Sequence, residues 1–140
     1  MTNLTAFLSQ NKIKQENIKF VASNNFIDEN KNPIEWEIRA ISQNEADELR
    51  KSCTKRVKIA GKGYINETDT DLYMSKVAAA CTVFPDLKNK ELQDSYKVMG
   101  DDQLLKAMLS LGEYTTYIQK ISDINGFDIS LDEAVDEAKN

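Results

Sequence analysis

The stretch Met108-Leu-Ser-Leu-Gly-Glu-Tyr114 (MLSLGEY) places a glycine in the middle of what its surroundings predict to be the longest helix of the chain. Apolar or small residues recur at intervals of three and four on both sides of it, which is the spacing of one helix face. We therefore expect one continuous helix over residues 101–125. Its apolar stripe comprises Leu104, Met108, Leu111, Thr115, Ile118 and Ile121.

A glycine in a helix interior costs roughly 1 kcal/mol relative to alanine, because it loses more backbone freedom on folding and packs no side chain. We expect Gly112 to compensate by letting a second helix, predicted over 72–84, approach closely. A larger residue at this position would then push the two helices apart. Gly112 could equally let the N-terminal hairpin approach closely or let the helix bend. The alternative is a flexible point that lets one apolar face open to a partner.

The neighbouring helices are delimited by start and stop signals. The preceding central helix is expected to run to Phe84, where Pro85 stops it, with Thr68 or Thr70 as its cap. A short helix follows, predicted from Asn89 to Met99.

Gly100 separates this short helix from the long one, whose first turn places Asp101 and Asp102 at the positive end of the helix dipole. Asn125-Gly126 ends the long helix, because glycine is favoured just past a C-terminus. A last helix from the capping box Ser130-Leu-Asp-Glu133 to Lys139 is expected to be strongly acidic.

The first 53 residues predict both strands and helices. Residues 2–10 favour a short docking helix, and the alternation of apolar and polar residues in 18–22 and 34–40 predicts an antiparallel hairpin with Trp36 facing the core. The capping box Ser42-Gln-Asn-Glu45 starts a helix over 43–53. The glycine-containing stretch 55–66 reads either as a mobile connection or as a second small hairpin.

These elements predict a single α+β, mainly α domain over 1–140. An N-terminal helix and hairpin (1–41) are expected to pack on four to five helices within 42–140, interrupted by a basic connection at 54–66. A chain of 140 residues buries enough surface for a real core. No apolar run is long enough to span a membrane, and the N-terminus lacks the pattern of a signal peptide.

Charge is unevenly distributed along the chain. The net charge is −5, yet the segment from 50 to 62 contains no acid and six bases, namely Arg50, Lys51, Lys55, Arg56, Lys58 and Lys62. Such a cluster fits a solvated connection, a patch for an acidic protein partner, or a nucleic-acid contact. The acidic balance of the remaining chain disfavours nucleic acid as the main partner.

The composition offers little for catalysis. The chain has no histidine, which removes the commonest general base and the commonest metal ligand, so we expect no enzyme activity, no metal and no cofactor. Gly61-Lys-Gly63 lacks the spacing of a phosphate-binding loop. Cys53 and Cys81 are not in a CxxC arrangement and are expected to be reduced structural thiols.

A series of short motifs resembles the XkdN-like tail assembly chaperones of long-tailed phages, prophages and phage-derived contractile particles of Gram-positive bacteria. The similarity extends from the hairpin to the end of the sequence and depends on the order and spacing of the motifs. They are Pro33-Ile-Glu-Trp36, Cys81-Thr-Val-Phe-Pro-Asp-Leu87, Glu91-Leu-Gln-Asp-Ser-Tyr96, Leu109-Ser-Leu-Gly-Glu-Tyr114, Asn125-Gly-Phe127 and Glu137-Ala-Lys-Asn140.

The resemblance implies an assembly factor of the bacterial host cytoplasm that is absent from the mature particle. Its implied partners are the tape-measure protein, which it would keep soluble, and the tail-tube protein; a longer frameshifted form and a homo-oligomer are also compatible with it. Expected partner-binding residues are Gly112, Glu113, Tyr114, Tyr117, Arg50, Lys55, Arg56 and Lys58. Expected structural residues are Trp36, Pro85, Leu87, Gly126 and Phe127.

Two other functions remain open at this point. A structural tail component would be found in purified particles, although the chain is predicted to be too helical for the β-rich sheets of tail-tube subunits. A nucleic-acid-binding regulator would use the basic segment, and its binding at physiological salt would be lost when Lys55, Arg56 and Lys58 become alanine.

Overall fold

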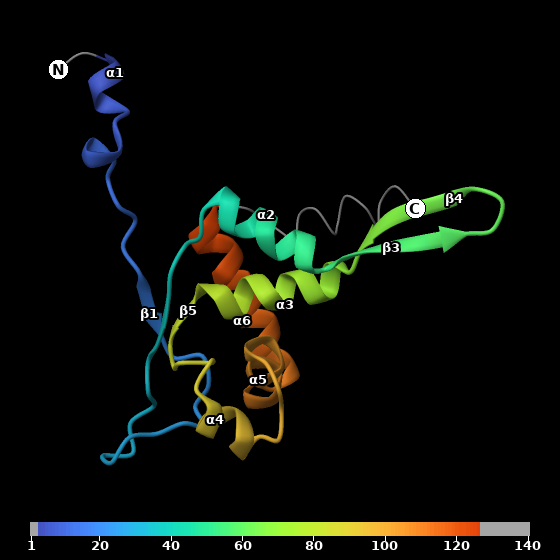
Figure 1. Cartoon of the computed structure of the whole chain (residues 1–140). Coiled ribbons are helices and arrows are strands. Elements are labelled where there is room, and N and C mark those ends of the chain that lie inside the picture. Colours follow the sequence, from blue (N-terminus) through green and yellow to red (C-terminus); the bar gives the residue numbers. More distant parts are fainter. Residues whose placement is uncertain (1–2, 127–140) are drawn as a thin grey trace.

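The computed structural model describes residues 3–126. Figure 1 shows a compact helical body from which an N-terminal arm and a long β-hairpin project in different directions. The elements, in chain order, are α1 (Asn3–Ala6), the 3₁₀ turn η1 (Ser9–Asn11), β1 (Ile18–Phe20), β2 (Trp36–Ile38), α2 (Gln43–Ser52), β3 (Thr54–Ile59), β4 (Gly63–Thr68), α3 (Thr70–Cys81), β5 (Thr82–Phe84), α4 (Lys90–Ser95), α5 (Asp101–Met108) and α6 (Leu111–Asn125). Mixed helices and small antiparallel sheets agree with the predicted α+β class.

A three-stranded sheet in the order β1-β2-β5 lies at one side of the body. Strands β1 and β2 pair antiparallel, with Phe20 opposite Trp36, and β5 adds to the other edge of β2. The third strand corrects the sequence prediction, which extended the central helix to Phe84. The residue before a proline is disfavoured in helical conformation, and Thr82-Val83-Phe84 has strand-forming side chains, so the helix ends at Cys81.

The core lies between this sheet and the helices. Helix α3 is central, packing on α2, α5 and α6. The side chain of Trp36 is 1% exposed, and its ring meets that of Tyr117 edge-on at 5.5 Å between centroids. Phe20 also packs against Tyr117, with centroids 5.6 Å apart. The predicted structural residues Trp36 and Leu87 are therefore core residues.

The predicted long helix is in fact two helices. Helix α5 ends at Met108, Leu109 adopts an extended conformation, and Ser110 caps α6. Ser110 and Glu113 form a reciprocal capping box, which satisfies two backbone amides at the new helix start. Leu109 is 7% exposed, so the break turns an apolar side chain into the core.

The break also corrects the role predicted for Gly112. Gly112 lies in the first turn of α6, and a Cβ added there would meet nothing within 4 Å. It therefore does not permit close helix packing. Leu111 is 86% exposed, so it does not belong to an apolar stripe facing the core; α6 instead buries Tyr117, Ile121 and Ile124.

The remaining helix ends show which caps the chain uses. Ser42 accepts from the Glu45 amide and starts α2 as predicted. Helix α3 is capped by Asp69 rather than by Thr68 or Thr70. Asn89 caps α4, which ends at Ser95 and is shorter than predicted.

Four of the five glycines have a positive φ, and Gly112 is the exception. Gly126 ends α6 with φ +77°, as predicted for the residue after a helix C-terminus. Gly61 and Gly63, with φ +79° and +77°, form the turn between β3 and β4. The stretch 55–66 is therefore a hairpin, which decides between the two predicted readings.

Two predictions are not addressed by the described residues. Phe127 and the acidic helix expected from Ser130 to Lys139 lie outside the part of the chain that the structure describes. Within residues 3–126, no helix is both long and apolar enough to span a lipid bilayer.

Candidate partner-binding surface

The predicted site residues Gly112, Glu113 and Tyr114 share the first turn of α6, but they differ in accessibility. Gly112 is exposed, whereas Tyr114 is half-buried against the core. The Glu113 carboxylate accepts from the Ser110 amide at 2.9 Å and also interacts with the buried hydroxyl of Ser23. These hydrogen bonds lower the pKa of Glu113 and tie the helix start to the loop after β1.

Tyr117, another predicted contact residue, is fully enclosed. Its hydroxyl hydrogen-bonds with that of Thr82, which joins α6 to the start of β5. Burial raises the pKa of the Tyr117 phenol. The enclosed Tyr117 side chain cannot contact a partner directly, so it can affect binding only by stabilising the fold.

The basic residues of 50–62 do not gather on one face. Residues directly opposite each other on an antiparallel pair share a face, and successive residues alternate. The register Lys58↔Tyr64 and Arg56↔Asn66 places these four side chains on one face of the β3–β4 hairpin, which we call the basic face. Lys55 lies on the opposite face, opposite Glu67.

The basic face combines cations with an aromatic ring. The Arg56 guanidinium lies 4.3 Å from the centroid of the Tyr64 ring, and Tyr64 is 56% exposed. Arg50, at the end of α2, lies 4.8 Å over the ring of Tyr73 in the helical body. Arg50 therefore belongs to the body and is separate from the cations that project on the hairpin.

The other face of the hairpin carries the Lys55–Glu67 pair at its base and apolar side chains beyond it. Val57 lies opposite Ile65, and Ile59 lies two residues further along the same face. We call these three residues the apolar face. Among the described residues, none of the three belongs to the hydrophobic core or to the side chains packed on it. A hollow of about 390 Å³ lies at the base of this face, lined by Cys53, Lys55, Val57, Glu67, Thr68, Asp69 and Thr70.

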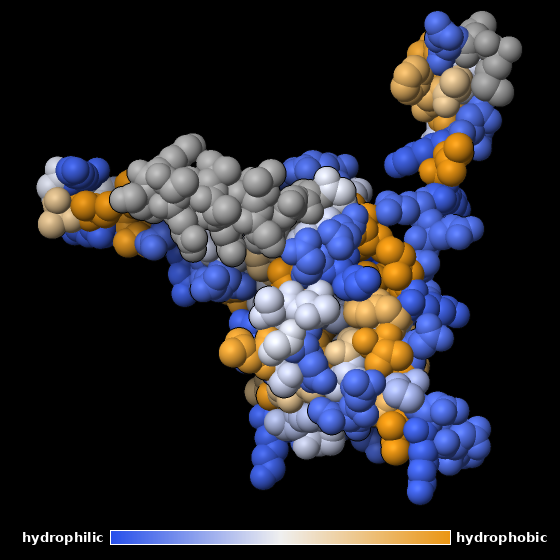
Figure 2. All heavy atoms as spheres, turned by 180° about the vertical axis from the view of Figure 1, so that it is seen from behind, coloured by the Kyte–Doolittle hydropathy of each residue, from blue (hydrophilic) through white to orange (hydrophobic). Residues whose placement is uncertain are grey.

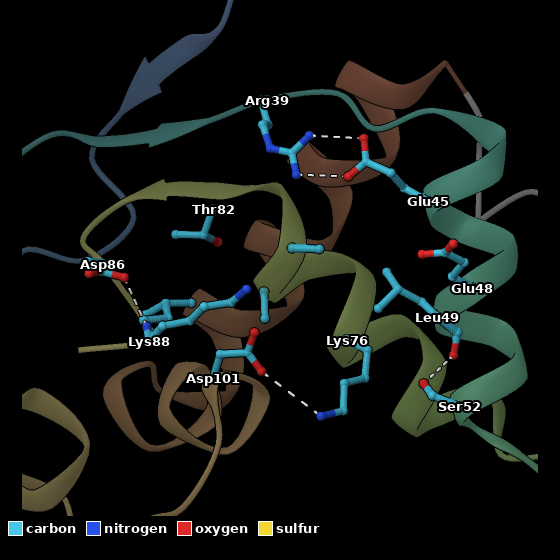
Figure 3. A pocket seen from close by; sticks show the side chains of 13 residues that line it. Arg39, Glu45, Glu48, Leu49, Ser52, Lys76, Thr82, Asp86, Lys88 and Asp101 are labelled. Atoms are coloured by element: carbon cyan, nitrogen blue, oxygen red, sulfur yellow. Dashed lines mark hydrogen bonds and ion pairs between the residues drawn. The ribbon is translucent and has the colours of Figure 1, made fainter. Parts of the chain in front are cut away.

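A charged pocket lies between α2, α3 and the segment that follows β5 (Figure 3). Arg39 donates to both Glu45 oxygens, at 3.3 and 2.9 Å, which lowers the pKa of Glu45. Lys76 Nζ lies 3.0 Å from Asp102 Oδ1 and 4.0 Å from Asp101 Oδ1. The opposite charges neutralise one another, and these ion pairs link the elements of the body around the pocket.

Sequence reasoning missed the Lys76–Asp102 pair. Asp102 is 3% exposed, and its hydrogen bond to Lys76 raises the pKa of the lysine. The sequence predicts only that both aspartates interact with the positive end of the helix dipole. Lys76, directly before the apolar run Val77–Cys81 of the central helix, was the available signal, because a charge beside buried residues needs a partner.

Several strongly exposed apolar side chains lie close together on the N-terminal arm, residues 3–16. Leu4, Phe7 and Ile13 are 77%, 84% and 91% exposed. Figure 2 shows hydrophobic residues on this arm, well away from the body, and along the β3–β4 hairpin. The arm is held at its base by Gln15, whose side-chain amide donates to the Ile124 carbonyl at 2.8 Å.

Within residues 3–126, no group of three or more His, Cys, Asp or Glu side chains is arranged to hold a metal ion. Cys53 and Cys81 are both buried and free, as predicted. Burial raises the pKa of the Cys81 thiol, which makes it less reactive at neutral pH.

Comparison with known proteins gives a consistent result. The sequence matches the family described as "Phage XkdN-like tail assembly chaperone protein, TAC" over residues 4–139. It is 32% identical over 139 residues to the phage-like element PBSX protein XkdN of Bacillus subtilis (strain 168), covering 99% of this chain and 94% of that protein. The uncharacterized protein YqbN of the same strain is also 32% identical, with 99% and 93% covered. A crystal structure of YqbN superposes with a TM-score of 0.77 at 30% identity, covering 91% of this chain and 99% of that one.

Proposed function

The chain belongs to the XkdN-like family of phage tail assembly chaperones, and from this premise we propose that it binds the tape-measure protein of a phage-type tail. In this proposal it keeps that protein soluble in the cytoplasm of the bacterial host and helps to recruit tail-tube subunits around it. It leaves before the particle is complete.

The exposed N-terminal arm is the observation that carries the proposal. Four apolar side chains within ten residues, Leu4, Phe7, Leu8 and Ile13, stand clear of the core. Such a concentration of exposed apolar surface is typical of binding sites for other proteins. A tape-measure protein is expected to expose apolar helical surface before the tube closes around it, and the arm supplies matching side chains.

The β3–β4 hairpin supplies a second contact of different chemistry. Arg56 and Lys58 project from the body beside the ring of Tyr64, where they suit acidic residues on a partner. Lys55 contributes from the other face of the same hairpin. Charged contacts of this kind increase the rate of association and select the partner, whereas the apolar arm contributes more of the affinity.

The start of α6 remains a predicted partner contact, and it projects less far than the arm or the hairpin. Gly112 is exposed and no described atom would meet a Cβ at this position, so the surface there is open to a partner. Glu113 and Tyr114 are engaged by the capping box and the core, and they shape this surface.

The proposal is tested by co-expressing the chain with the longest coiled-coil-rich tail protein encoded near it. One partner is tagged, and the mass of the purified complex is measured by light scattering. We expect a defined soluble complex, with the long partner insoluble when expressed alone. If the long protein is equally soluble alone and nothing co-purifies, the proposal is wrong.

A matched pair of variants assigns the contact to the arm. Phe7→Ser should reduce the yield of the complex about tenfold, because a well-buried aromatic anchor contributes on the order of 1.4 kcal/mol or more. Met99→Ser is the control, because Met99 is 93% exposed but lies on the body. Equal losses in both variants would show that the arm has no special role.

A further inference from the structure

We propose that two copies of the chain pair through their β3–β4 hairpins. The paired surface is the side of the hairpin opposite the basic face, which carries Lys55, Glu67 and the apolar face, and a two-fold axis along the hairpin relates the two copies. The pairing needs no tail protein, so it is independent of the proposed function. It follows from the register of the hairpin and from the side chains that this register places on one side.

Most of the length of the paired surface is apolar. Val57, Ile59 and Ile65 lie on it, and among the described residues none of them packs on the hydrophobic core. Ile65 is 44% exposed. A two-stranded hairpin is marginally stable in water unless one face packs against other structure. Figure 1 shows the hairpin projecting beyond α2 and α3, so the described body does not supply this cover.

The register of the hairpin makes this surface self-complementary. A two-fold axis parallel to the strands exchanges the positions of β3 and β4, so each residue faces, on the second copy, the residue that it pairs with in its own hairpin. Val57 then faces Ile65 of the second copy. Ile59 faces Gly63 of the second copy, where the missing side chain leaves room for it. The apolar side chains can therefore interdigitate, as they do between packed sheets.

The charged residues at the base of the surface obey the same symmetry. Lys55 faces Glu67 of the second copy, and Glu67 faces Lys55 of the second copy, which gives two ion pairs across the contact. Both side chains are exposed, and within residues 3–126 neither is held in an ion pair. Packed sheets lie about 10 Å apart, a gap that these two long side chains bridge together. The charges therefore select this arrangement, and the apolar side chains contribute more of the affinity.

The remaining charges near this surface do not oppose the contact. Asp69 also lines the hollow at the base, but its carboxylate accepts from the Leu72 amide at 3.0 Å as the cap of α3. Arg56 and Lys58 lie on the basic face and point away from the second copy. Under the proposed function, these two cations stay accessible to a tail protein, whereas Lys55 is engaged by the second copy.

Other ways of pairing two hairpins satisfy fewer of these groups. A two-fold axis across the strands would place Lys55 over Ile59 of the second copy, so the charges would lose their partners. Edge-to-edge pairing would leave the apolar face exposed, and through β3 it would also bring the bases of the two copies together. In the proposed arrangement, the crossing angle of about 30° between packed sheets turns the two bodies away from each other.

Charge reversal in the purified full-length chain tests the pairing in the absence of any tail protein. Lys55→Glu gives a copy with acids at both positions, and Glu67→Lys gives a copy with bases at both. Each variant should repel itself, whereas an equal mixture of the two restores both ion pairs. Lys58→Glu is the matched control, because it makes the same charge change on the same strand but on the other face. The fluorescence of the buried Trp36 verifies that each variant is folded.

A small contact of this kind lies at the weak end of specific interfaces, so sedimentation velocity should cover concentrations of about 10–500 µM. We expect a reversible dimer for the wild type and for Lys58→Glu. Association should be at least about tenfold weaker for Lys55→Glu and for Glu67→Lys, and close to wild type for their mixture.

A wild-type chain that stays monomeric throughout this range would overturn the proposal. If the two charge-reversal variants dimerise like the wild type, or if Lys58→Glu weakens the dimer as much as they do, the dimer uses another surface and the proposal is wrong. A mixture that associates as weakly as its components would show that the two charges do not face each other, which also overturns it.

Discussion

Gly112 illustrates how the environment of one residue decides its role. It lies in the exposed first turn of α6, outside any packing contact that a Cβ would disturb. Its backbone is ordinary helix, without the positive φ found at Gly100 or Gly126. Gly112 therefore lowers the stability of the fold, and no contact in the described structure offsets this effect.

Gly112→Ala should increase the free energy of unfolding by about 0.5–1 kcal/mol, because alanine restricts the unfolded chain and favours the helix. Thermal unfolding of the variant measures this. A lower melting temperature would contradict the open environment of Gly112. Gly112→Leu should also melt near the wild-type temperature, and if it then failed to bind a tail protein, Gly112 would lie in the interface.

Lys76 is a second residue whose effect follows from its partner. Lys76→Met leaves the buried Asp102 carboxylate without its charge partner, which should cost about 1–3 kcal/mol. Lys106→Met, at an exposed position of α5, is the control. Denaturant unfolding at neutral pH distinguishes the two variants, and equal stabilities would show that the pair contributes nothing.

The same pair predicts a dependence on pH. The folded-state pKa of Lys76 lies above its ordinary value of 10.5, so the charged form stabilises the fold below that pH. This contribution is lost as the pH rises through the folded-state pKa. The stability difference between wild type and Lys76→Met should therefore be constant up to about pH 10 and then shrink. A difference that grows above pH 10 would reverse the sign and contradict the assignment.

At the scale of elements, the junction between α5 and α6 shows the limits of sequence periodicity. The apolar spacing of 104–121 continues through the break, which is why one helix was predicted. The sequence did contain the competing signal, the capping box Ser110-Leu-Gly-Glu113, but only tertiary packing of Leu109 decides between them. Strand β5 was missed for a similar reason, because its three residues form a strand only by pairing with β2.

Two helix starts with a local cap were predicted correctly, whereas the equally local caps of α3 at Asp69 and of α6 at Ser110 were not. Ser42 and Asn89 were identified as caps because their hydrogen bonds involve residues three positions away. The candidate surface could be predicted only as residue types. The two faces of the β3–β4 hairpin depend on register, and the exposure of the arm depends on what the rest of the chain leaves uncovered.

Ser110→Ala should lower the free energy of unfolding by about 1 kcal/mol, because the Glu113 amide loses its acceptor at the start of α6. Ser110→Asp keeps an acceptor and should remain close to wild type. Circular dichroism during thermal unfolding compares the two. If both variants are destabilised equally, the Ser110 hydroxyl contributes through packing and not as the hydrogen-bond acceptor at the helix start.

At the scale of the whole molecule, the fold separates a stable body from two projections. The family assignment suggested by short motifs is confirmed by the match over residues 4–139. The body contains the aromatic core and the compensated charges, whereas the arm and the hairpin carry the exposed apolar and basic residues. This division should let the exposed residues of the two projections vary with little effect on the fold.

This division predicts that substitutions in the arm leave the free energy of unfolding almost unchanged. Phe7→Ser should change the free energy of unfolding by less than about 0.5 kcal/mol, as expected for an exposed side chain away from the core. Trp36→Ala should instead cost about 3–5 kcal/mol, because it leaves a cavity beside Tyr117. Denaturant unfolding provides both values, and a large loss for Phe7→Ser would make the arm part of the folded body.

In the proposed function this chain acts on a tail during assembly and is absent from the finished particle. The most direct measurement is quantitative mass spectrometry of the tagged chain isolated from cells that are assembling tails, alongside particles purified from the same cells. We expect the tape-measure protein in a fixed ratio with the chain in the cells, and no chain in the particles. A stoichiometric amount of the chain in the purified particles would make it a structural component and contradict the account.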